Sequence, residues 1–284
     1  MKKCFLTFGT YTILLSFVTA CTGARQIAGN TPGTTKVPTN ISTNTITNEK
    51  RVGPVRASNS SLKDDGGEFY ALGATMMWAM WGYKYDRPWL ERNLEMLSKN
   101  GFDYIRAIAA MSRTPAQAGD YWYSLDMNTQ WPDYDAVLAG LMDLAYDKYG
   151  LRVEWTIFGG AFDFNESQKQ NLIDRVLAMS KGREHKIIHF ETANEYEGTG
   201  WDDTSLRNWT RYLNGKTNIL VAASHAYQQT NDLCGEFQAL YAGGIADIGT
   251  WHFDREDRMA DGLWRPVRQP WEYAYCSGMP NIGS

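Results

Sequence analysis

The sequence KIIHFETANE occupies residues 186–195 and joins a short apolar run to a polar pair. Residues 186–191 are rich in β-branched and aromatic side chains, which predicts a buried strand. Asn194 and Glu195 follow this strand closely, and ligands bind at the carboxyl ends of parallel strands. The stretch therefore predicts a parallel α/β fold with Asn194 and Glu195 at its functional edge.

Similar apolar runs recur on both sides of this strand and alternate with amphipathic stretches. The predicted strands cover 69–74, 104–109, 152–158, 186–191, 218–222 and 246–251, and the predicted helices 89–100, 134–149 and 168–181. Strand starts recur every 28–49 residues or so, which favours βαβ units and a (β/α)8 barrel. A dinucleotide-binding sheet is disfavoured, because residues 73–78, GATMMW, lack its Gly-rich phosphate turn.

The N-terminal residues have the features of an export and anchoring segment. Residues 1–20 predict a signal peptide, and the sequence VTAC ending at Cys21 resembles the bacterial lipobox, whose cysteine is lipidated. We expect an extracytoplasmic protein, lipid-anchored to a bacterial membrane, with plain secretion as the alternative. Residues 21–67 are expected to form a flexible Thr/Asn/Ser-rich tether, so that the folded domain comprises residues 68–284.

Composition excludes several classes of function for the 284 residues. The net charge of −4 argues against nucleic acid as a partner, since phosphate binding requires a cationic surface. The four His lack a metal-ligand spacing, and we expect no metal and no cofactor. Cys234 and Cys276 are interpreted either as a disulfide or as two separate thiols. The aromatic content of 13% suits a neutral carbohydrate ligand, bound by a protein expected to be a monomer.

Four polar residues near the predicted strand ends carry a family resemblance: Arg106, Asn194, Glu195 and His252. The set resembles the clan of retaining (β/α)8-barrel glycoside hydrolases that includes cellulase-like and β-mannanase-like families. The resemblance implies that Glu195 is the general acid/base, that Asn194 contacts the sugar 2-hydroxyl, that Arg106 orients the nucleophile and that His252 contacts substrate or carboxylate. Aromatic residues expected to stack on sugar rings are Trp78, Trp81, Trp201 and Trp251.

The sequence departs from this clan at the nucleophile. The clan places a second Glu at the end of strand seven, and the strand spacing predicts strand seven near residues 279–283. We therefore expect an incomplete barrel, with about six strands and the start of a seventh, and a nucleophile just beyond residue 284. Glu272 is interpreted as part of the loop or short helix before strand seven. The other carboxylates near strand ends, interpreted as cleft or surface residues, are Asp163, Glu197, Asp254 and Glu256.

Two alternatives to a retaining hydrolase with Glu195 as acid/base remain open from the sequence. One is a non-catalytic, surface-tethered glycan-binding lipoprotein that keeps a glycosidase-like barrel. The other is a hydrolase that uses carboxylates already present, such as Glu195 with Asp163.

Overall fold

The computed structural model describes residues 50–59, 61–110, 128–160, 164–195, 199–224, 233–252 and 279–283. Five strands form a parallel sheet in chain order, namely β4 (Gly73–Thr75), β5 (Tyr104–Ala110), β6 (Arg152–Phe158), β7 (Ile187–Ala193) and β8 (Val221–Ala222). Asp247 and Ile248 donate backbone hydrogen bonds to the carbonyl of Val221, which brings the next segment alongside β8. The parallel pair β9 (Gly249–Trp251) and β10 (Asn281–Gly283) completes a series of seven parallel strands among the described residues. This succession is that of a (β/α)8 barrel, as the sequence predicts.

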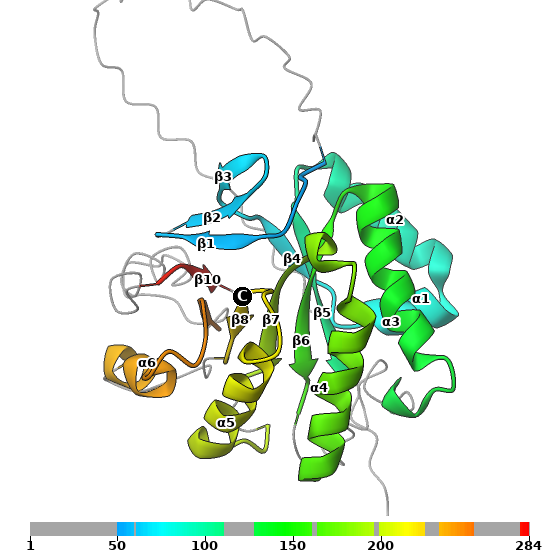
Figure 1. Ribbon diagram of the computed structural model, residues 1–284. Helices are drawn as coiled ribbons and strands as arrows, with labels where there is room; N and C mark the ends of the chain where they lie inside the picture. The colour runs from blue at the N-terminus through cyan, green and yellow to red at the C-terminus, as the bar shows by residue number, and fades with distance from the viewer. Residues whose placement is uncertain are drawn as a thin grey trace, which may run out of the picture. The chain divides into compact units, whose positions relative to one another are not determined.

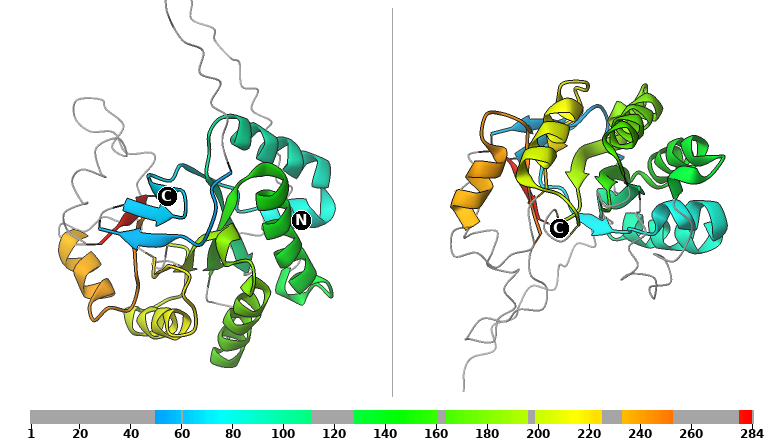
Figure 2. Two further views of the ribbon diagram at one scale, coloured as in Figure 1. Left: turned by 45° about the horizontal axis from the view of Figure 1, so that its top comes forward. Right: turned by 90° about the horizontal axis from the view of Figure 1, so that it is seen from below.

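Helices lie on the outer side of these strands (Figures 1 and 2). They are α1 (Ala79–Tyr85), α2 (Arg87–Lys99), α3 (Tyr134–Asp143), continued by a π-helical turn (Leu144–Lys148), α4 (Glu166–Ser180), α5 (Asp203–Asn214) and α6 (Leu233–Tyr241). α2 buries Leu90, Leu94 and Leu97, which share one face because they are spaced by three and four residues. In the described part of the chain no helix has both the length and the apolar character required to cross a membrane.

Side chains alternate between two environments along the central strands. In β6, Trp155 is a fully buried member of the main apolar core, whereas Glu154 and Thr156 on either side of it bond polar residues of β5 and β7. This period of two is inherent to a β-strand. The strands thereby combine an apolar face under the helices with a polar interior.

The predicted tether is wrong for residues 50–67. Three short strands, β1 (Arg56–Ser58), β2 (Ser61–Asp64) and β3 (Gly67–Phe69), form an antiparallel sheet in which Val55, Leu62 and Phe69 are buried. These side chains pack with Tyr104, Ile188, Leu220, Ile248 and Ile282 of the barrel segments in a second apolar cluster. The folded part thus begins upstream of residue 68. The remaining tether residues, the signal peptide and Cys21 lie outside the described residues.

A buried ion-pair cluster fastens this small sheet to the barrel. The Asp64 carboxylate accepts hydrogen bonds from Arg51 Nε at 2.8 Å and from Arg152 Nη1 at 2.9 Å, and the side chains of Asp64 and Arg152 are buried. Arg152 also donates to the carbonyls of Gly53 and His185. Because Arg152 is the first residue of β6, the sheet covers the amino-terminal end of the barrel.

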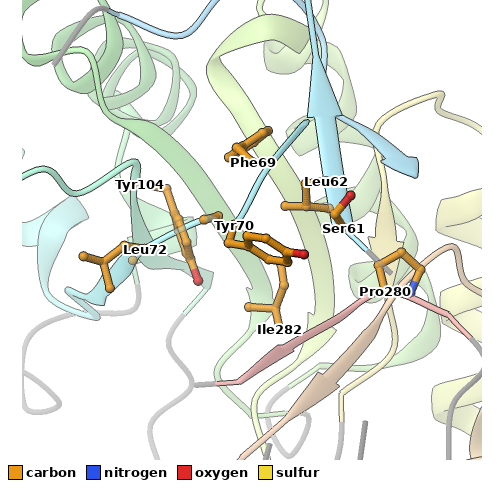
Figure 3. A pocket seen from close by; sticks show the side chains of 10 residues that line it. Ser61, Leu62, Phe69, Tyr70, Leu72, Tyr104, Pro280 and Ile282 are labelled. Carbon is orange, nitrogen blue, oxygen red and sulfur yellow. The ribbon is translucent and has the colours of Figure 1, made fainter. Parts of the chain in front are cut away.

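A cavity of about 240 Å³ lies between the small sheet and the ends of β4, β5 and β10 (Figure 3). Its labelled wall includes Leu62, Phe69, Tyr70, Tyr104 and Ile282. Tyr70 lines this cavity although it is 86% exposed. None of Arg106, Asn194, Glu195 and His252 lines the cavity, which therefore belongs to the opposite end of the strands from the predicted site.

Several predicted elements shift in the structure. The predicted strand 69–74 is wrong, because Phe69 ends the antiparallel β3 and the first barrel strand is β4 at 73–75. Helix α1 was not expected from the sequence. The fifth and sixth predicted strands are shorter in the structure, and the predicted seventh strand is present as β10. Cys234 is disulfide-bonded, which excludes a free thiol there, while Cys276 lies outside the described residues.

Candidate active site

The residues predicted at the strand ends meet in one place. Arg106 lies in the middle of β5, and its guanidinium donates to three acceptors: Glu154 Oε1 at 3.0 Å, Glu191 Oε2 at 2.6 Å and Asn194 Oδ1 at 3.0 Å. All four side chains are buried. A planar guanidinium with five N–H donors in a fixed fork can serve three separate acceptors in one arrangement, whereas a lysine concentrates its three donors at one nitrogen. Arg106 and Asn194, both expected at the site, are in direct contact.

The sequence pattern does not mark Glu191 as a site residue, although its carboxylate is at the centre of the site. Its Oε1 lies 3.0 Å from His252 Nε2, and its Oε2 accepts from Arg106 and from Thr156 Oγ1. Burial raises the pKa of this carboxyl, but the Arg106 guanidinium and His252 outweigh burial and hold the pKa well below its ordinary value. Glu191 is therefore an ionised carboxylate that binds protein groups.

A sequence signal for Glu154 and Glu191 does exist. Each interrupts an otherwise apolar strand, and a carboxylate at a buried strand position requires a cationic or donor partner. Arg106, in the predicted strand next to that of Glu154, is a cationic residue of this kind. In the structure it also serves Glu191, which lies one strand further on.

Glu195 occupies an unusual backbone conformation at the end of β7. Its φ is +38°, in the left-handed region that side chains other than glycine rarely adopt. The preceding strand is fixed by hydrogen bonds from Ala193 N to Ala223 O and from Asn194 N to Phe158 O, and Thr199 Oγ1 donates to the carbonyl of Glu195. Strain of this kind concentrates at functional sites. It turns the chain so that the Glu195 side chain, 30% exposed, is accessible where Glu191 is not.

His252 lies between the two carboxylates. It follows β9 and is buried, and its Nδ1 lies 3.8 Å from Glu195 Oε1 while its Nε2 faces Glu191. The role expected for His252, a contact with substrate or carboxylate, stays a prediction, and in the structure its ring faces the carboxylates of Glu191 and Glu195. Tyr241, on α6, is fully buried close by, and burial is the main cause of its raised pKa, with Glu191 adding to it.

The predicted sugar-stacking aromatics have different surroundings. Trp251 points away from the site, because its ring stacks on Phe237 of α6 at 4.3 Å in the apolar core. Its predicted role in substrate binding is wrong, since a strand alternates its faces and His252 takes the inner side. Trp201 is also buried, with its ring against Phe158 at 5.3 Å.

Trp78 and Trp81 remain candidates for sugar stacking. Both are half-buried and follow β4 at its carboxyl end, and Trp78 stacks on Trp89 with ring centroids 4.1 Å apart. Asp163, Glu197, Asp254, Glu256 and Glu272, which the sequence offered as other carboxylates, lie outside the described residues. Within the described ranges, no group of three or more His, Cys, Asp or Glu is arranged to hold a metal ion.

Several solved structures have a fold similar to that of this chain. A β-mannanase from Thermomonospora fusca, solved with mannohexaose, superposes with a TM-score of 0.56 at 13% identity, covering 81% of this chain and 74% of that one. An endo-1,4-β-mannanase from Rhizomucor miehei gives 0.57 at 15% identity and 81% of both chains. A family 5 mannosidase from the same organism gives 0.58 at 14% identity, over 82% of this chain and 72% of that one.

The fold is a (β/α)8 barrel like those of these structures. A cellulase is also similar, with a TM-score of 0.54 at 14% identity over 83% of this chain and 71% of that one. No model of a known protein family matches the sequence, and no curated protein does either. At these identities the likeness establishes the fold alone, and activity, substrate and chemistry are argued from the site itself.

Proposed function

We propose that this protein is a retaining β-glycoside hydrolase in which Glu195 is the general acid/base. The observation that carries the proposal is the placement of Glu195: an accessible carboxylate on strained backbone at the end of a barrel strand, beside His252 and after Asn194. Hydrolysis of a glycoside requires a proton for the leaving oxygen and later a base for the attacking water. One exposed carboxyl in a largely buried polar cluster can perform both steps in turn.

Asn194 is oriented to bind the sugar. Its Oδ1 accepts from Arg106 Nη2 at 3.0 Å, so its Nδ2 group is the donor that can reach a substrate hydroxyl. A hydrogen bond to the sugar 2-hydroxyl strengthens as the oxocarbenium-like transition state forms. Asn194 thereby stabilises the transition state more than the bound substrate, which is the requirement for catalysis.

The retaining mechanism also needs a carboxylate nucleophile, about 5–5.5 Å from the acid. Glu191 is unsuited to this role, because it is buried and both of its oxygens bind protein donors. The nucleophile is therefore a carboxylate other than Glu191. The first test does not depend on which residue supplies it.

We place the substrate among β-linked polysaccharides and oligosaccharides. β-1,4-Mannan and cellulose-derived oligosaccharides come first, because the similar structures include mannanases and a cellulase. Trp78 and Trp81 at the carboxyl end of β4 suit such chains, since pyranose C–H faces stack on indole rings. Loop contacts decide among sugars of this class.

Product analysis on a panel of β-mannans, β-glucans and their oligosaccharides tests this proposal. We expect reducing ends to be released by the wild type and the rate to fall by a factor of 100–10,000 or so in Glu195→Gln, which keeps the shape and removes the acid. Glu95→Gln, a change in an exposed helical Glu remote from the strand ends, is the matched control and should retain full activity. Glycan binding without turnover by the wild type would instead support the glycan-binding alternative.

We further propose that the protein is a lipid-anchored, extracytoplasmic monomer held by Cys21. The sequence VTAC that follows an apolar segment supports this proposal. Cys21→Ser should move the protein from the membrane fraction to the soluble fraction of expressing bacteria and abolish incorporation of labelled fatty acid. Unchanged fractionation and labelling would refute the anchor.

A further inference from the structure

Glu191 lies in β7, four residues before the proposed acid/base in the sequence, and its side chain belongs to the polar interior of the barrel. It points to the same face of the strand as the side chain of His189, because the two are separated by two residues. The side chain is 1% exposed and has hydrogen-bonding partners on three other segments, Arg106 of β5, Thr156 of β6 and His252 after β9. Because the Glu191 carboxylate is enclosed and hydrogen-bonded to all three of these residues, it fixes the positions of their side chains.

His252 connects Glu191 to Glu195. A carboxylate 3.0 Å from Nε2 favours a proton on that nitrogen, which makes Nδ1 the ring nitrogen that faces Glu195 Oε1 at 3.8 Å. Second-layer carboxylates fix histidine tautomers in this way in many protein sites. The same Glu191 binds Arg106, which in turn binds Asn194. Glu191 thus orients Glu195 through His252 and Asn194 through Arg106.

We propose that Glu191 is a positioning residue for the acid/base Glu195, acting through the ring of His252 and through Arg106. The inference rests on the proposed glycosidase function only for its consequence on turnover. The arrangement of His252 is a property of the unliganded protein. Glu191 itself contacts no substrate.

The ring nitrogens of His252 provide a test that needs no substrate. In the full-length wild type, ¹⁵N chemical shifts should show Nε2 of His252 protonated. In Glu191→Gln, which lacks the anionic acceptor, the preference for Nε2 should be reduced or lost. Glu154→Gln is the matched control, because it removes an equally buried carboxylate that binds Arg106 through Nε and lies closer to His189. The control should keep the wild-type tautomer of His252.

A tautomer with the proton on Nδ1 in the wild type would overturn the inference, and so would a Glu191→Gln protein with an unchanged His252 ring. The wild-type measurement alone can overturn the inference where the variants do not fold. For folded variants, Glu191→Asp, which keeps the negative charge, should retain the Nε2 tautomer that Glu191→Gln weakens or loses.

A lower kcat with an unchanged His252 tautomer in Glu191→Gln would reduce Glu191 to a structural role and contradict the inference. Absence of turnover by the wild type on every glycan would refute the proposed function instead. The tautomer measurement would still show whether Glu191 orients His252. The two failures are therefore distinguishable.

Discussion

At the residue scale, Glu195 illustrates how function and stability oppose each other. Its φ of +38° costs a residue with a Cβ about 1–2 kcal/mol relative to glycine. The strand bonds of Asn194 and the bond from Thr199 maintain this conformation. The carboxylate is thereby presented to solvent while Glu191, on the same strand, remains enclosed.

Two substitutions at Glu195 measure this strain. Glu195→Gly and Glu195→Ala both remove the carboxylate, but only glycine adopts a positive φ without steric cost. We expect Glu195→Gly to have a free energy of unfolding about 1 kcal/mol higher than Glu195→Ala, as measured by urea denaturation. Equal stabilities, or a more stable alanine variant, would show that the backbone is not strained in solution.

Arg106 allows a second prediction at this scale. Arg106→Lys keeps the charge but cannot donate to Glu154, Glu191 and Asn194 together, so at least one buried acceptor loses its partner. The free energy of unfolding should fall by roughly 2–4 kcal/mol, and glycosidase activity should be lost with it. Arg56→Lys, at an exposed position with a single exposed ion pair, is a suitable control, and thermal unfolding monitored by circular dichroism compares the two. If Arg106→Lys lowered the free energy of unfolding no more than the control does, the three buried hydrogen bonds of Arg106 would not contribute to stability as proposed.

The sequence indicates four of the residues at this site and misses Glu154 and Glu191. Asn194, Glu195 and His252 are predictable because each closely follows an apolar strand, where barrel chemistry occurs, whereas Arg106 is implied by the family resemblance. Glu154 and Glu191 lie within strands, where burial suggests packing. Trp251 was assigned to the site because proximity in sequence to His252 does not reveal which face of the strand a side chain occupies.

At the element scale, the small antiparallel sheet is the main difference between expectation and structure. Its residues belong to a segment rich in Thr, Ser, Asn and Gly, whose composition predicts disorder. Composition does not record that Val55, Leu62 and Phe69 find an apolar surface on the barrel, or that Asp64 meets Arg152. Helices and central strands were predictable because their periodicity is local, whereas this sheet depends on contacts distant in sequence.

Adjacent aspartates test how the sheet is fastened. Asp64→Asn leaves the buried Arg152 without its anionic partner and should lower the free energy of unfolding by about 3 kcal/mol. Asp65→Asn removes a mainly exposed ion pair with Arg56 and should change it by less than about 1 kcal/mol. Urea denaturation of both variants gives the comparison. Similar losses for the two would show that Asp64 is not a buried anchor.

At the scale of the whole molecule, stability should depend on carboxylates buried at both ends of the strands. Burial raises the pKa of Asp64, but hydrogen bonds from Arg51 and Arg152 outweigh burial and lower it, and the pKa of Glu191 is likewise held below its ordinary value of 4.5. Both groups bind protons more readily in the unfolded chain. Their stabilising contribution is therefore complete above the unfolded pKa values and is lost as pH falls through and below them.

This linkage predicts the acid behaviour of the protein. The unfolding temperature should be nearly constant from neutral pH to about pH 5 and should fall progressively below pH 4.5 or so. Glu191→Gln should show a smaller dependence on pH in the acid range, because one of the titrating groups is absent. Scanning calorimetry between pH 3 and 7 measures both proteins. A wild type that became more stable below pH 4.5 would contradict the ionised state of these carboxylates.

The central claim is that Glu195 protonates the leaving group of a β-glycoside. A leaving group that departs readily as an anion does not need this proton, whereas a sugar or alkyl alcohol does. The most direct measurement is the first-step rate of Glu195→Gln relative to wild type on matched β-glycosides, one with a dinitrophenyl and one with a sugar leaving group. We expect the variant to lose little of this rate on the dinitrophenyl glycoside and to lose a hundredfold or more on the glycoside with the sugar leaving group. Equal losses of rate on both substrates would contradict the role of Glu195 as the acid.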